Sequence, residues 1–491
     1  MPEHDSDEPR PVAPPSGGAA PPVGTRGYRA APRVLELGDG FYDEVTAAAF
    51  PSLRPRFRND RAAASVGLDG LDGEAWERHF ARFEPLPDNL LRPLALRYHG
   101  HQFDAYNPDL GDGRGFLYAQ LEDDRGRLLD LGTKGTGRTP WSRGGDGRLT
   151  LKGGVREVLA TEMLEALGVD TSRSFSLFET GEALERGDEP SPTRSSVLVR
   201  LSHSHVRFGS FQRHAYARDV ARIQRLLEYS VRHLAPSSAR PTLAETAVAF
   251  VEDVAVKSAA MVAGWMVSGF VHGVLNSDNM NVTGESFDYG PWRFLPRYDP
   301  DFVAAYFDHG GLYAFGRQPT AVFRNVTRLA SALAALAPDA PFASALAAYE
   351  PALLRGVHAR LAARLGVAPR GHDEDDALLD AVYTFLGAVP VPYDRFFFDW
   401  YGGLASEARA RAGAAASLYA GDAFDALRAR LAPYAPRDPS RLDLAYFRGD
   451  GPCTMTIDEV ERVWAAIAAR DDWGPFESKI AAVRAMGEAI G

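Results

Sequence analysis

The sequence predicts an α+β protein of two lobes followed by a helical extension, and three observations support this prediction. Strand-like runs separated by Gly-rich loops are concentrated before residue 215, whereas periodic apolar segments typical of helices prevail after it. The length of 491 residues allows two or three units, each with a core of its own. With 45% hydrophobic and 24% charged residues, the composition excludes collagen-like, globally disordered and disulfide-scaffold proteins.

We expect four segments along the chain. Residues 1–30 are rich in Pro and Gly and lack the apolar or Arg-rich pattern of an export or transit signal, so they are expected to form a disordered tail. Residues 31–215 should form the mixed β/α first lobe, residues 216–404 a mainly helical second lobe, and residues 405–491 the helical extension. Near the end, Thr456–Glu459 has the pattern of a capping box that opens a final helix.

The charge balance and the cysteine content restrict the class of protein. The chain carries 54 basic and 65 acidic side chains, and the net charge of −11 argues against a protein whose main partner is a nucleic acid. Cys453 is the only cysteine, so neither an intrachain disulfide nor a Cys-based zinc site can form within the chain. This fits a reducing compartment, and we expect a cytoplasmic protein.

The least polar window, 258–275, is long enough for a membrane span to be considered. It contains His272 and three glycines, however, and it runs directly into the polar string NSDN. We therefore expect a buried helix that ends in a functional loop, and no membrane partner.

Local patterns place several elements in order after residue 110. The Gly-rich loop 111–115, GDGRG, is followed by strand-like runs at 116–121 and 127–134, with turn residues between them. A helix with apolar residues at helical spacing is expected at 155–168, and β structure at 196–209.

Transfer of a phosphoryl or nucleotidyl group needs a backbone loop over the phosphates, a Lys that holds them, a carboxylate that holds the Lys, and metal ligands opposite. The glycines at 111, 113 and 115 would let main-chain N–H groups approach an anion. Lys134 ends the second strand, and Glu157 follows 23 residues later on the helix, in the order of the Lys–Glu pair of kinases. The alternative is a plain hairpin turn with two surface charges.

The segment 272–279, HGVLNSDN, is the most informative string. A DYG motif follows it, beginning nine residues after Asn279. In kinases a catalytic loop ends in an Asn metal ligand and a D-x-G motif supplies the second ligand, so Asn279 and Asp288 would hold Mg²⁺. The catalytic Asp of kinases would fall on Val274, which cannot accept a proton, and Asp278 is the nearest replacement. Otherwise the string is a polar turn and Asp288 caps a hairpin.

Arg200 and Arg207 lie in or near the expected β segment. A guanidinium matches two phosphate oxygens, and extra Arg in a nucleotide cleft favours holding a terminal phosphate rather than releasing it. Alternatively, each arginine pairs with one of the 65 acidic residues.

Longer strings occur in a fixed order along the chain: GHQFDAYNPDLGDGRG, LGTKGTGRTPWSRGGDGR, VREVL, VLVRLSHSHVRFGSF, FVHGVLNSDNMNV, FDYGPWRFLPRYDPDFV and DHGGLYAFGRQP. Together they resemble the selenoprotein O family, the YdiU-type protein adenylyltransferases, from about residue 30 to about residue 405. The resemblance implies a protein-kinase-like, two-lobed fold that binds ATP in a flipped orientation. It also implies transfer of AMP to Ser, Thr or Tyr hydroxyls of proteins, with release of pyrophosphate.

Carried over position by position, the resemblance implies a role for each candidate residue. Asp278 would be the proton acceptor, Asn279 and Asp288 the metal ligands, and Glu157 the partner of Lys134. The nucleotide would be contacted by Gly111, Gly113, Arg114, Lys134, Asp146, Gly147, Arg200, Arg207 and Asp288. The first lobe would then bind ATP, and the second would carry the catalytic loop and the Mg²⁺ or Mn²⁺ site. The remaining partner would be a protein acceptor.

One departure and two alternatives accompany the resemblance. Family members commonly end in a redox-active Cys or selenocysteine, whereas 38 residues follow Cys453, which puts an intramolecular disulfide switch in doubt. A γ-phosphoryl kinase would use the same residues but lacks a base at Val274. A catalytically inactive pseudokinase scaffold is the other alternative, and the presence of the Lys–Glu pair and of both metal ligands argues against it.

Overall fold

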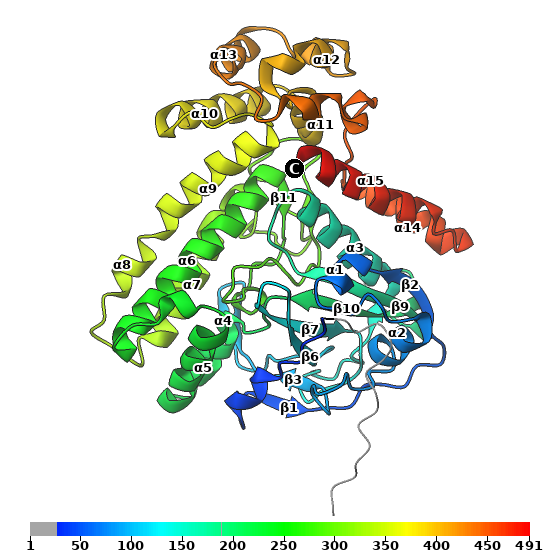
Figure 1. Cartoon of the computed structure of the whole chain (residues 1–491), viewed down its shortest axis with the longest axis vertical. Coiled ribbons are helices and arrows are strands. Elements are labelled where there is room, and N and C mark those ends of the chain that lie inside the picture. The colour runs from blue at the N-terminus through cyan, green and yellow to red at the C-terminus, as the bar shows by residue number, and fades with distance from the viewer. Residues whose placement is uncertain (1–26, 188) are drawn as a thin grey trace, which may run out of the picture.

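The computed structural model of the chain describes residues 27–187 and 189–491 (Figure 1). Residues 1–26 of the expected tail lie outside the described residues, and Ala30 pairs with Leu121 of the sheet. The fold is a mixed α/β arrangement, with one curled antiparallel sheet in the first part of the chain and helices around and after it. This mixture agrees with the α+β prediction.

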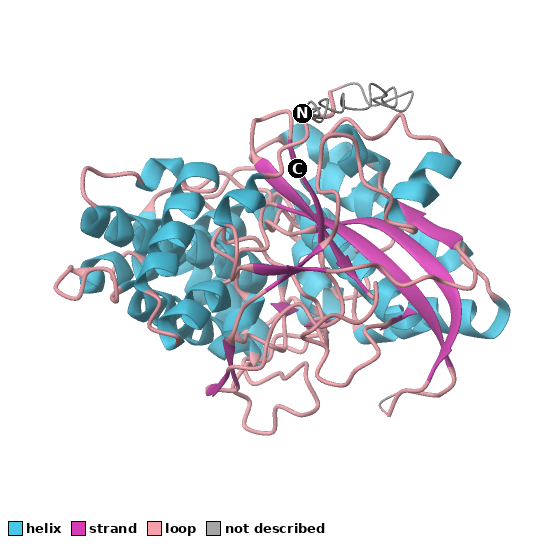
Figure 2. Ribbon diagram, turned by 90° about the horizontal axis from the view of Figure 1, so that it is seen from below, coloured by secondary structure: helices cyan, strands magenta, loops and turns pink. Residues whose placement is uncertain are grey.

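The sheet has the strand order β1-β3-β6-β7-β10-β9-β2, with β8 paired to β10, and its pairings are antiparallel. Figure 2 shows its long strands curving along one side of the molecule. The strands are β1 (Tyr42–Glu44), β2 (Arg54–Arg58), β3 (Leu94–Leu96), β6 (Leu117–Glu122), β7 (Leu128–Lys134), β8 (Leu149–Thr150), β9 (Arg173–Leu184) and β10 (Thr193–Ser202). The β6–β7 hairpin is the predicted strand–turn–strand unit, with each boundary within one residue of its expected place.

Helix α3 (Leu151–Ala166) carries Glu157 as predicted, but it begins before the expected range. The side chain of Thr150 caps it by accepting a hydrogen bond from the Gly153 N–H group. Two glycines in its first turn weaken the local helical signal, which explains why the sequence hides this start. Gly168, with φ of +72°, follows its end.

Two small antiparallel pairs flank the segment that holds the predicted base. One is the hairpin of β4 (Gly100–Gln102) and β5 (Ala105–Asn107), and the other joins β11 (Phe270–Val271) to β12 (Arg293–Phe294). Between β11 and β12 the chain forms a 3₁₀ turn at Ser277–Asn279. This turn lies within the string NSDN, for which the sequence predicted a catalytic loop.

Most of the remaining helices follow the sheet in the chain. Helix α6 takes up most of the least polar window and is largely buried, as predicted, and it packs against α7 and α9 (Figure 1). None of the helices in the described ranges is both long and apolar enough to cross a membrane. The helices are α1 (Asp60–Ala64), α2 (Gly73–Phe80), α4 (Phe208–Tyr216), α5 (Val220–His233), α6 (Leu243–Ser268), α7 (Gln318–Leu333), α8 (Phe342–Leu346), α9 (Tyr349–Arg364), α10 (His372–Ala388), α11 (Tyr393–Asp399), α12 (Glu407–Ala412) and α13 (Asp422–Leu431).

Two helices, rather than the single final helix expected, close the chain: α14 (Ile457–Arg470) and α15 (Gly474–Ile490). Thr456 is the N-cap of α14, but its side chain makes no capping bond. Both helices return to the first part of the chain and pack against α3 (Figure 1). Their apolar residues belong to the same buried cluster as those of α3 and α6.

Candidate functional site

A cleft of about 730 Å³ brings together the Gly-rich loops, strands β7 and β10, and the segment that carries the 3₁₀ turn. Every predicted nucleotide, base and metal residue lines it. These residues are Gly111, Gly113, Arg114, Lys134, Asp146, Gly147, Arg200, Arg207, Asp278, Asn279 and Asp288. Glu157 does not line the cleft and lies behind Lys134. Residues as much as 177 positions apart in sequence therefore share one cavity.

Lys134 and Glu157 form the expected ion pair. Lys134 ends β7 and Glu157 projects from α3, and both side chains are more than nine-tenths buried. The Lys134 Nζ atom also lies 3.7 Å from an oxygen of Asp288. Burial lowers the pKa of Lys134, and the neighbouring Glu157 carboxylate partly offsets this effect. The lysine is thus fixed between two carboxylates.

Arg200 and Arg207 converge on Asp288 from different elements. Arg200 lies on β10 opposite Gly132, on the same face of the sheet as Lys134, and Arg207 is the N-cap of α4. Each arginine donates a hydrogen bond to one oxygen of the Asp288 carboxylate. Burial would raise the pKa of Asp288, but the three cations hold it well below its usual range.

These arginines keep unused donors. The Nε atoms of Arg200 and Arg207 are buried and have no hydrogen-bond partner among the described residues. A buried donor without a partner is costly, which suggests that the cluster is built to receive further oxygen atoms. Phosphate oxygens are suitable acceptors for such a group of guanidinium and ammonium ions.

Asp278 lies in the middle of the 3₁₀ turn and is 8% exposed. Its Oδ1 atom has no hydrogen-bond partner among the described residues. Burial raises its pKa to about 6, against the opposing charge of Arg207. A buried carboxylate with a free oxygen and a raised pKa is chemically suited to accept a proton.

Asn279 and Asp288 offer oxygen ligands for a divalent cation. The Nδ2 atom of Asn279 donates to the Val274 carbonyl at 3.0 Å, which leaves its Oδ1 atom available. In the described part of the chain, no group of three or more His, Cys, Asp or Glu side chains could hold a metal. A two-ligand protein site fits Mg²⁺ that is otherwise bound by phosphate oxygens and water.

The β4–β5 hairpin packs against Asp278, the predicted base, and the sequence analysis did not predict this contact. A Cβ atom added to Gly100 would lie 2.7 Å from Oδ1 of Asp278, so only glycine fits against this carboxylate. The His101 N–H group donates to Ser277 Oγ at 2.8 Å, and Ser277 Oγ donates to Gln212 Oε1 at 2.6 Å. The string GHQ gives no local signal of these contacts, because the turn lies 176 residues further along the chain.

The glycines of the GDGRG loop also have a packing role. A Cβ atom at Gly111 would meet the ring of Trp141, and one at Gly113 would lie 2.8 Å from the Trp141 carbonyl oxygen. The Ser142 hydroxyl donates to the Gly113 carbonyl at 2.5 Å. The two Gly-rich loops are therefore fastened together, and the sequence analysis did not identify Trp141 as the connection.

Asp146 and Gly147 shape the second loop. The Asp146 carboxylate pairs with Arg186 and accepts a hydrogen bond from the Arg148 N–H group. Gly147 has φ of +69°, and a Cβ atom there would lie 2.0 Å from the Gly137 carbonyl oxygen. These two residues thus fix the shape of the loop that lines the cleft.

Comparison with known proteins agrees with this geometry. The family model described as "Protein adenylyltransferase SelO" matches residues 27–484, and so extends well beyond residue 405, where the resemblance was expected to end. The chain is 44% identical over 462 residues to the protein nucleotidyltransferase YdiU of Gloeobacter violaceus, covering 92% of this chain and 94% of the relative. It is 42% identical over 466 residues to the Synechocystis protein of the same name, covering 91% and 96% of the two chains.

A more distant relative extends the comparison. The protein nucleotidyltransferase YdiU of Vibrio vulnificus is 36% identical over 371 residues, covering 75% of this chain and 74% of the relative. The family match spans nearly all of the described residues, including both Gly-rich loops, α3 and the Ser277–Asn279 turn. The chain therefore belongs to the protein adenylyltransferase SelO family, a family of nucleotide-transferring enzymes.

Proposed function

We propose that the chain transfers AMP from ATP to Ser, Thr or Tyr hydroxyls of proteins and releases pyrophosphate. The convergence of three buried cations on Asp288 is the observation that carries this proposal. Lys134, Arg200 and Arg207 supply charge for two phosphate groups at one buried end of the cleft. The β and γ phosphates would be retained there, and the α phosphate would face the acceptor.

This orientation of ATP is the reverse of that in a protein kinase. The proposal combines this orientation with a kinase-like, two-lobed fold. The first lobe would be 31–215, the second 216–404 and the extension 405–491. Val274 supports it, because a γ-phosphoryl kinase would need a base at this apolar position. In place of a base at position 274, Asp278 directly precedes the proposed metal ligand Asn279. Its Oδ1 atom has no hydrogen-bond partner among the described residues and can accept a proton.

The reaction step balances as follows. The acceptor oxygen attacks the α phosphorus while its proton passes to the Asp278 carboxylate. The bond between the α phosphorus and the bridging oxygen to the β phosphorus breaks, and pyrophosphate leaves with the electron pair. The product is a phosphodiester between AMP and the protein hydroxyl.

The protein holds the reacting groups and neutralises charge. Asn279 and Asp288 would hold Mg²⁺ or Mn²⁺, which when bound supplies positive charge to the phosphate oxygens. Arg200 and Arg207 would turn the donors that now bind Asp288 towards the phosphates. Their Nε atoms, which have no partner among the described residues, are further donors for the phosphate oxygens. Glu157 keeps Lys134 charged and fixed in place.

Isotope transfer tests the proposal. The protein is incubated with a protein lysate and either [α-³²P]ATP or [γ-³²P]ATP, with an Asp288→Ala variant as the control. We expect label from the α position in proteins and none from the γ position. Label from the γ position alone would identify a kinase, and the absence of both labels would identify a binding scaffold.

A further inference from the structure

Helices α14 and α15 are far in sequence from the residues that line the cleft. They lie against α3, the helix that carries Glu157, the partner of Lys134. They return from the end of the chain to pack against α3 (Figure 1), and the ring of Phe476 in α15 lies against that of Phe57 in β2. The family match extends to residue 484 and so includes all of α14 and most of α15. Nothing in the proposed chemistry uses these helices directly.

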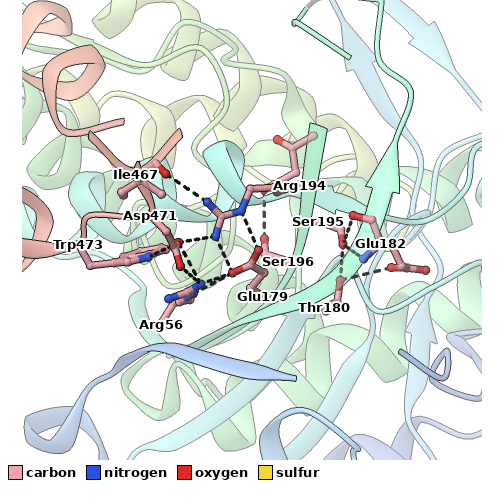
Figure 3. Close-up of polar contacts among 11 residues, drawn as sticks. Arg56, Glu179, Thr180, Glu182, Arg194, Ser195, Ser196, Ile467, Asp471 and Trp473 are labelled. Carbon is pink, nitrogen blue, oxygen red and sulfur yellow. Dashed lines mark hydrogen bonds and ion pairs between the residues drawn. The ribbon is translucent and has the colours of Figure 1, made fainter. Parts of the chain in front are cut away.

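The link between the two helices is fixed to the sheet by a cluster of charges. The carboxylate of Asp471 accepts hydrogen bonds from Arg56 of β2, at 3.1 Å, and from Arg194 of β10, at 2.6 Å (Figure 3). Both arginines also bind the buried Glu179 of β9. The Arg56 guanidinium lies 4.6 Å from the ring centroid of Trp473. Asp471 therefore joins the C-terminal helices to strands β2 and β10, whose arginines also bind β9.

Helix α15 is then fixed to α3. Arg484 forms a bidentate pair with Glu162 of α3, with hydrogen bonds of 2.7 and 2.8 Å. Glu162 is 2% exposed at its side chain, so this pair is desolvated on the carboxylate side. A Cβ atom added to Gly487 would lie 3.1 Å from the Cβ atom of Ala166, which shows how closely the two helices approach.

The opposite side of α3 faces the cleft. Glu157 binds Lys134, and the neighbouring Arg156 donates to the carbonyl oxygens of Gly290, the last residue of the DYG motif, and of Trp292. Movement of α3 would therefore displace the Lys134 partner and the segment that carries Asp288 together. A helix that contacts a different group on each side couples the two groups if it has two discrete arrangements.

We propose that α14 and α15 hold α3 in the position in which Glu157 can bind Lys134, and that Asp471 and Arg484 are positioning residues for ATP binding. This inference deepens the proposed function and rests on it, because Lys134 is the residue assigned to the ATP phosphates. The two residues touch neither substrate nor metal and act through α3.

The proposal makes a specific kinetic prediction. If α3 exchanges between a docked and a displaced state, and ATP binds only the docked state, the apparent Kd for ATP rises by the inverse of the docked fraction. Saturating ATP then restores the docked state. Loss of the clamp should therefore raise the KM for ATP and leave kcat nearly unchanged. A purely structural defect would instead lower kcat through a smaller folded fraction and leave KM unchanged.

The test uses full-length protein with Asp471→Asn and Arg484→Gln, singly and combined. Asn tolerates the left-handed conformation of residue 471, φ of 51°, so the first change removes the charge without straining the backbone. Glu477→Gln is the matched control, because this exposed α15 carboxylate has no ion pair within the described residues. The Kd of Mg·ATP is measured by equilibrium dialysis, and KM and kcat by α-label transfer. We expect about a tenfold rise in Kd and KM for the combined variant.

The outcomes separate this inference from the proposed function. An unchanged Kd for ATP in the combined variant, or a fall in kcat at unchanged KM, would overturn the clamp. Wild-type protein that binds ATP but transfers no α label would contradict the proposed function while leaving the Kd comparison valid.

Discussion

The charged groups on the two sides of the cleft differ in whether they are paired. On the sheet side, Lys134, Arg200 and Arg207 are all paired with carboxylates, and their positions are fixed by β7, β10 and the start of α4. On the side of the 3₁₀ turn, Asp278 keeps an oxygen atom with no partner among the described residues. The first arrangement is suited to binding and the second to proton transfer, so changes on the two sides should affect different kinetic constants.

Asp288 belongs to both sides, and its loss should have the largest effect. Asp288→Ala removes a proposed metal ligand and leaves two buried arginines without their shared counter-charge. We expect at least about a 10³-fold fall in α-label transfer, since this chemistry depends mainly on positioning and electrostatics. The measurement is initial transfer rate, with circular dichroism to confirm folding. Asp301→Ala, which removes an exposed carboxylate, is the control, and near-wild-type transfer by Asp288→Ala would refute the shared role.

Asp278→Asn should separate the two sides. The amide keeps the shape of the side chain but cannot take a proton at neutral pH, so kcat should fall by about 10²-fold. The Kd for ATP should change by less than about threefold, because the cations on the sheet side are untouched. Single-turnover transfer and equilibrium ATP binding measure the two quantities. A loss of ATP affinity as large as the loss in kcat would show that the two sides are not separable.

Much of the sheet side could be predicted from the sequence, because its signals are local. The hairpin that ends at Lys134 and the helix that carries Glu157 follow from strand, turn and helix patterns within about 50 residues. The kinase-like spacing of Asn279 and Asp288 is also local. The structure places all of these residues at one site, although their chemical roles remain proposals.

The surroundings of Asp278 could not be predicted in the same way. Gly100 and Gln212 reach the 3₁₀ turn from distant segments, and the ion pair of Asp146 with Arg186 crosses from one loop to the β9–β10 connection. None of these contacts leaves a periodic or motif signal. The same limitation applies to α14 and α15: the sequence predicted a helical extension, but not the surface against which its helices pack.

Glu157→Gln should affect the sheet side more weakly than the loss of Asp288. The amide can still accept a hydrogen bond from Lys134, but it no longer supplies the charge that offsets the burial of the lysine. We expect the Kd for ATP to rise by about tenfold, with kcat at saturating ATP reduced less, since the lost contact supports binding. Equilibrium dialysis with Mg·ATP measures the first quantity. A fall in kcat without a change in Kd would place Glu157 functionally with Asp278.

The smallest effect is expected at Cys453, which belongs to neither side of the cleft. Burial raises the pKa of this thiol to about 11, so at pH 8 only about one molecule in a thousand carries the reactive thiolate. Iodoacetamide should therefore modify the native protein slowly at pH 8, and much faster in urea, where the thiol returns to its ordinary pKa. Cys453→Ser should leave both kcat and the Kd for ATP within about twofold, because no cleft residue contacts the thiol. Rapid labelling of the native protein, or a variant with altered ATP affinity, would connect this buried position to the cleft and weaken the division between its two sides.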